Sequence, residues 1–94
     1  MTAADYPTVA MFSNSTAKEI RLYLEMMCEE VILAPGHSVD LLAKPLPDLL
    51  PLAIHQVEGG MQVIPFQEID PNWHVRFRGK ILKAAHPLRL AEHE

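Results

Sequence analysis

The sequence has a single cysteine, Cys28, among its 94 residues, so no disulfide can form within the chain. Small secreted domains commonly use several disulfides to support a small core, because their surroundings are oxidising. A disulfide-stapled scaffold is therefore excluded and a reducing compartment is favoured. We expect a cytoplasmic protein in which Cys28 is a buried, unreactive thiol.

Long apolar runs and a surplus of positive charge are also missing. No stretch approaches the roughly 20 apolar residues of a membrane span. The first twelve residues lack the basic region and long apolar run of a secretory signal. Eight Lys and Arg residues against twelve Asp and Glu residues give a net charge of −4, which disfavours unspecific attraction to phosphate backbones. We expect neither membrane nor nucleic acid as a partner.

The composition that remains is that of a small folded domain. Hydrophobic residues make up 49% of the chain and charged residues 21%, an ordinary balance for a globular protein. We expect one domain over residues 1–94, with 1–15 as an edge strand or a loose arm and 84–94 as a frayed tail. A chain of this length buries only roughly 60–65% of its unfolded surface. Any site should therefore be shallow or shared with a partner.

Residues 17–33 fit two periodicities. A helix is supported by Thr16 and Glu19, which match a capping box, and by apolar residues at helical spacing. Two strands are supported by the alternation of Ile20, Leu22 and Leu24 with polar residues. The downstream Ala34-Pro35-Gly36-His37 is typical of a type II turn between strands, because glycine supplies the positive φ at the third position. That turn favours the strands.

This part of the chain resembles a pattern in small uncharacterised bacterial proteins. The matching residues are Leu22-Tyr23-Leu24-Glu25, Glu29-Glu30, Leu33-Ala34-Pro35-Gly36, Val39 and Leu41, with Val75 to Lys80 similar to the closing strand of that group. The chain departs from the pattern at Met26-Met27-Cys28, where the group has Pro-Trp-Gly. The resemblance implies strands and turns, and it implies no activity, because the group has none assigned.

The rest of the sequence indicates further short strands. Three prolines between Lys44 and Pro51 predict a crossover loop, since proline cannot donate to a ladder. Gly59-Gly60 between two apolar runs predicts a hairpin with its turn on these glycines. We predict an all-β sandwich or small open barrel of six or seven strands, with an α+β domain carrying a helix at 17–33 as the alternative.

One strand has a pattern with a bearing on function. Trp73, Val75 and Phe77 alternate with basic residues, so one face of the strand is aromatic and apolar and the other is cationic. The cationic face consists of His74, Arg76, Arg78 and Lys80. Such a row is a candidate binding surface for an acidic partner or a phosphate, although a solvated sheet face explains it more simply.

Other candidate sites are weaker. A copper site of the His₂Cys type would need Cys28, two of His37, His55 and His74, and a methionine, but the usual clustering of these ligands in one loop is missing. No zinc spacing and no motif that activates a cysteine nucleophile is present. We therefore expect no metal or cofactor and no enzyme.

The favoured function is a non-catalytic interaction or structural module that binds an unknown protein or self-associates through an edge strand. Two alternatives stay open, a cupredoxin-like metal-binding domain and a small hydrolase that uses Cys28.

Overall fold

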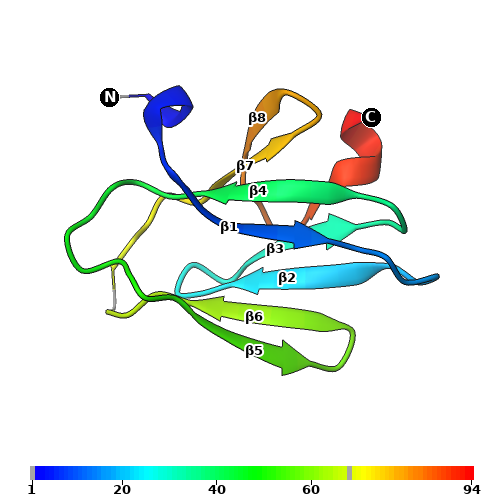
Figure 1. Cartoon of the computed structure of the whole chain (residues 1–94), viewed down its shortest axis with the longest axis horizontal. Coiled ribbons are helices and arrows are strands. Elements are labelled where there is room, and N and C mark those ends of the chain that lie inside the picture. Colours follow the sequence, from blue (N-terminus) through cyan, green and yellow to red (C-terminus); the bar gives the residue numbers. More distant parts are fainter. Residues whose placement is uncertain (1, 68) are drawn as a thin grey trace.

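Two β-sheets form the two layers of the protein, as the computed structural model shows for residues 2–67 and 69–94 (Figure 1). The first sheet has the order β1-β4-β7-β8 and the second β5-β6-β2-β3-β9. The strands of the first sheet are β1 (Thr8–Ser13), β4 (Ser38–Leu42), β7 (His74–Phe77) and β8 (Lys80–Lys83). Those of the second are β5 (Ala53–Val57), β6 (Gly60–Ile64), β2 (Ile20–Leu24), β3 (Glu29–Leu33) and β9 (Leu88–Arg89). Two 3-10 turns, η1 (Ala3–Asp5) and η2 (Leu90–His93), flank them.

This architecture confirms the all-β sandwich and makes the helical alternative at 17–33 wrong. That segment is the antiparallel hairpin β2–β3, paired from Ile20 with Leu33 to Leu24 with Glu29. Cys28 adopts φ +54°, which lets the chain turn between the strands without a glycine or proline. The described residues form nine strands, more than the predicted six or seven, and one of them, β9, lies in the segment that was expected to fray.

The core lies between the two sheets and explains the alternating patterns. Trp73, Val75 and Phe77 of the β7 segment point inward and are buried, as their spacing predicts. They meet side chains of the second sheet: Leu22, Leu24, Val31, Leu33 and Val63. The proline-rich 43–52 segment crosses from one sheet to the other and inserts Leu49 into this core. The Pro35–Gly36 turn is also present, with Gly36 at φ +84°.

The β5–β6 hairpin differs from its prediction by one residue. The turn is centred on Glu58 and Gly59, whose φ is +81°, and Gly60 already belongs to β6. A Cβ atom on Gly60 would lie 1.8 Å from the carbonyl oxygen of Arg21 on the parallel neighbour β2. Gly60 is therefore needed for the close approach of two strands rather than for the turn.

Both ends of the chain are tied to the sandwich. The expected frayed tail at 84–94 is wrong: β9 pairs in parallel with β3, and Leu90 is 0% exposed. Leu88 and Leu90 bury enough apolar surface to hold a segment whose polar composition predicted fraying. Of the 1–15 segment, the described residues 2–15 form η1 and the edge strand β1 rather than a loose arm. No helix in the described ranges is long and apolar enough to cross a membrane.

Candidate functional site

The predicted basic row is only partly formed. His74 and Arg76 lie on β7 with half-buried side chains, opposite in direction to the buried Val75. Arg78 is not on the strand: its φ of +51° places it with Gly79 in the turn that joins β7 to β8. Lys80 begins the returning strand. The four basic residues therefore do not form one straight row, because the chain reverses in the middle of the sequence pattern.

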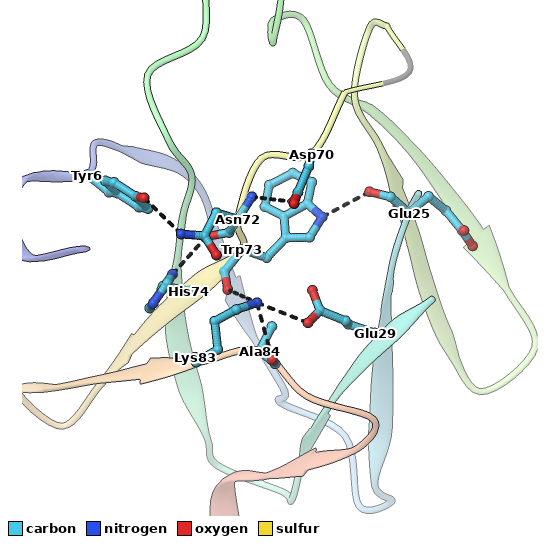
Figure 2. A network of polar contacts seen from close by, with 9 residues as sticks. All are labelled: Tyr6, Glu25, Glu29, Asp70, Asn72, Trp73, His74, Lys83 and Ala84. Carbon is cyan, nitrogen blue, oxygen red and sulfur yellow. Dashed lines mark hydrogen bonds and ion pairs between the residues drawn. The ribbon is translucent and has the colours of Figure 1, made fainter. Parts of the chain in front are cut away.

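Two of the four basic residues, His74 and Lys80, make contacts within the fold. The His74 ring lies 2.7 Å, through Nδ1, from the carbonyl oxygen of Asn72 and is edge-on to the ring of Tyr6 at 5.5 Å (Figure 2). Lys80 Nζ donates to the carbonyl oxygen of His93 at 3.2 Å, so it holds the C-terminal turn against the β7–β8 hairpin. Polar groups of His74 and Lys80 are thus already used in contacts within the chain and are less available to a ligand.

The other two cations, Arg76 and Arg78, line a shallow hollow of about 220 Å³. We call it the arginine hollow. Arg76 Nη1 lies 3.5 Å from Asp40 Oδ2, and Arg78 Cζ lies 5.1 Å from the centroid of the Phe77 ring. The hydroxyls of Ser13 and Ser38, 2.9 Å apart, complete its lining. The sequence could not indicate these serines, because they come from β1 and β4 and meet the arginines only through strand pairing.

A second polar cluster joins the two sheets (Figure 2). Lys83 Nζ on β8 donates to Glu29 Oε2 on β3 at 3.0 Å and to the carbonyl oxygens of Trp73 and Ala84 at 3.4 and 3.5 Å. The indole nitrogen of Trp73 donates to the carbonyl oxygen of Glu25 at 2.9 Å. Two carbonyls and one carboxylate thus accept hydrogen bonds from the same ammonium group, and the bond to Glu29 links β8 of the first sheet to β3 of the second.

A histidine–carboxylate pair lies beside the β7–β8 hairpin, where the His37 ring is edge-on to Phe77 at 4.9 Å. His37 is 3% exposed, and its Nδ1 accepts the backbone N–H of Ala34 at 3.0 Å. The proton is therefore on Nε2, which donates to the side chain of Glu94. This hydrogen bond, helped by the charge of Arg78, holds the pKa of Glu94 below its usual range. Both ring nitrogens of His37 form hydrogen bonds within the chain, so the ring links Glu94, after the C-terminal turn, to the turn between β3 and β4.

The cysteine and histidine candidates do not converge. Cys28 is exposed in the β2–β3 turn, which makes the expected burial of its thiol wrong. Cys28 precedes β3 and His37 follows β3, so this five-residue strand, roughly 15 Å long, separates the two residues. His55 lies on the edge strand β5. Within residues 2–67 and 69–94, no group of three or more His, Cys, Asp or Glu side chains is placed to hold a metal ion.

A groove of about 800 Å³ lies between the β1–β2 loop and the β5–β6 hairpin. All five residues of β5 are exposed. Ile54 pairs with the buried Val63 and so faces the side of the sheet that packs on the first sheet, yet it is 45% exposed. The second sheet therefore extends beyond the first and leaves apolar side chains of its inner face uncovered. Sequence patterns could not show this, because it depends on the relative widths of the sheets.

Comparison of the chain with protein families, curated proteins and solved structures finds no match.

Proposed function

We propose that this protein is a non-catalytic, cytoplasmic interaction domain that binds an extended segment of another protein along β5. The observation that carries the proposal is the exposed edge strand β5, which borders the apolar groove. The groove is open and offers apolar side chains rather than convergent catalytic groups, which favours a binding role.

The backbone of β5 supports strand addition. Within the described residues, β5 is paired only with β6. Hydrogen-bonded pairs alternate along an antiparallel ladder, so every second residue of β5 directs its amide and carbonyl away from β6. Edge strands are commonly protected by charged residues or proline. β5 has the sequence Ala-Ile-His-Gln-Val, which contains neither a proline nor a lysine or acidic residue.

The side chains near this edge support recognition of apolar residues in the partner. Ile54 is 45% exposed and Val57 is 37% exposed, and both line the groove together with Met61. In strand addition the backbone supplies affinity while pockets for alternate side chains supply selectivity. Ile54 and Met61 lie on the same face of the sheet, so a partner segment with apolar residues at every second position would cover them, whereas Val57 belongs to the other face.

The test is selection of peptides from a random display library, followed by mapping of the bound peptide on the ¹⁵N-labelled protein by NMR. We expect selected peptides to shift the β5 amides and to slow their hydrogen exchange. Ile54→Lys should abolish binding without unfolding the protein, because this side chain is already half in water. Met11→Lys on the other edge strand is the matched control, since Met11 is 75% exposed.

Three results would count against the proposal. Peptides whose binding survives Ile54→Lys would place the interface elsewhere, and loss of binding in Met11→Lys would move it to β1. A concentration-dependent dimer that Ile54→Lys disrupts would make a second copy of the chain the occupant.

A further inference from the structure

We propose a second binding site: the arginine hollow, whose lining shares only Ser13 with that of the groove, binds the carboxylate group of an acidic polypeptide. The hollow lies at the end of the first sheet where β1, β4 and the β7–β8 turn meet. Its volume of about 220 Å³ accommodates one small polar group rather than a cofactor.

Arg78 is held in place but keeps its donors. Its guanidinium lies over the Phe77 ring, with Cζ 5.1 Å from the ring centroid, and such stacking restricts where the group can move. In the part of the chain that the structure describes, no hydrogen bond or ion pair within 4.0 Å engages this guanidinium. A guanidinium has five N–H donors in a planar fork that matches the two oxygens of a carboxylate.

Arg76 is also available, although it has a partner. Its Nη1 is 3.5 Å from Asp40 Oδ2, and both side chains are more than a third exposed. An exposed pair at this distance contributes little, because water screens it and each side chain has other solvated arrangements. The donors of Arg76 can therefore turn toward a ligand at little cost.

Two serine hydroxyls add directional donors. Ser13 Oγ and Ser38 Oγ are 2.9 Å apart, so one hydroxyl donates to the other. The second hydroxyl then has its hydrogen available for a ligand oxygen. The hollow thus offers charge from two arginines and a neutral donor from the serine pair on β1 and β4.

Charge balance distinguishes a carboxylate from a phosphate. Arg76 and Arg78 carry one positive charge each and Asp40 one negative charge, which leaves a net charge of about +1 among the groups lining the hollow. A carboxylate neutralises this charge. A phosphate ester, with a charge of roughly −1.5 to −2, would leave an excess of negative charge beside Asp40. Glu94 is not part of the lining, but its negative charge acts on Arg78 and further disfavours a doubly charged ligand.

The experiment is an NMR titration of the ¹⁵N-labelled full chain with four probes at low salt. The probes are a capped tripeptide with a central Asp, the same peptide with Asn, an uncharged peptide with a free C-terminal carboxylate, and inorganic phosphate. We expect the Asp peptide to cause saturable shifts at the amides of Ser13, Ser38, Arg78 and Gly79. The Asn peptide should cause none. The third probe shows whether a chain end serves as well as a side chain.

Variants then assign the binding to the hollow. Arg78→Gln should weaken binding of the Asp peptide roughly tenfold, the loss that removal of one charge-assisted pair commonly causes. Ser38→Ala should weaken it less. Arg89→Gln, which removes one positive charge on β9 of the other sheet, is the matched control and should bind as the parent does. The spectrum of each variant shows that it is folded.

Several outcomes would overturn the assignment. They are the absence of saturable shifts with either carboxylate probe, equal binding by Arg78→Gln and the parent, and tighter binding of phosphate than of the Asp peptide. Weakening by Arg89→Gln as large as that by Arg78→Gln would show unspecific charge attraction. The result is independent of the groove, because Ile54→Lys should leave this titration unchanged and Arg78→Gln should leave selected peptides bound at β5.

Discussion

The two adjacent glycines of the β5–β6 hairpin should respond differently to alanine. At Gly60 the new Cβ would lie 1.8 Å from the carbonyl oxygen of Arg21, whereas Cβ atoms essentially never come within 3.0 Å of another heavy atom. Strand β6 must then move away from β2, which breaks the Arg21 N–H to Gly59 carbonyl bond of 3.0 Å. Overpacking costs about 1–3 kcal/mol and the lost hydrogen bond about 1 kcal/mol more, so we expect about 3 kcal/mol of destabilisation by Gly60→Ala.

At Gly59 the cause is backbone conformation instead of space. Its φ is +81°, and an added Cβ would meet no atom within 4 Å. We expect Gly59→Ala to cost about 1–2 kcal/mol, the strain of a left-handed conformation for an L-residue. Asparagine tolerates positive φ better, so Gly59→Asn should cost less than Gly59→Ala. Gly60→Asn should stay as damaging as Gly60→Ala, because asparagine also has a Cβ.

Urea unfolding followed by fluorescence measures all four variants. Trp73 is the chain's one tryptophan and is 0% exposed, so its emission reports on the core. A domain of this length has a free energy of unfolding of roughly 5–14 kcal/mol, and a loss of about 3 kcal/mol is readily resolved. Gly60→Ala within about 1 kcal/mol of the parent, or rescue by asparagine at position 60, would refute the close approach of β2 and β6.

Three further predictions concern the core and the C-terminal turn. Trp73→Phe should destabilise the protein by about 1–3 kcal/mol, because the Glu25 carbonyl loses its indole donor. Urea unfolding followed by circular dichroism measures this cost, and a value under about 0.5 kcal/mol would mean that the bond is unimportant. Leu90→Ala should cost about 2–5 kcal/mol and speed hydrogen exchange in β9, whereas a frayed tail would make it neutral. The pKa of Glu94 is lower in the folded state than its ordinary 4.5. Its bond to His37 therefore stabilises the fold above pH 4.5, and this stabilisation is lost as the pH falls through the lower folded pKa. The stability difference between the parent and Glu94→Gln should therefore shrink on acidification in unfolding measurements; a difference independent of pH would contradict the hydrogen bond from His37 to an ionised Glu94.

Local patterns were sufficient for much of the fold. The period-two spacing of Trp73, Val75 and Phe77 correctly predicts which side chains enter the core, because side chains of a strand alternate whatever the strand pairs with. The Pro35–Gly36 turn is equally local, since the ring of proline fixes its φ and glycine, which has no Cβ, adopts a positive φ.

Other features depend on pairing between distant segments and left no local signal. The arginine hollow needs Ser13 and Ser38, which meet only because β1 pairs with β4. The departure of Arg78 from the basic row depends on the tight β7–β8 turn, where a non-glycine residue takes positive φ. The anchoring of the tail depends on Leu90, a single apolar residue in a polar segment.

The parallel pairing of β3 with β9 has a consequence for how the chain folds during synthesis. β3 emerges from the ribosome long before Leu88, yet its second edge stays without a partner until β9 has been made. Since distant pairings require closure of a long loop before any contact stabilises it, folding should be slow, on the millisecond to second scale of all-β domains. A nascent chain that ends before Leu88 would expose β3 to pairing with other chains. The last strand to be made is thus the one that closes this edge.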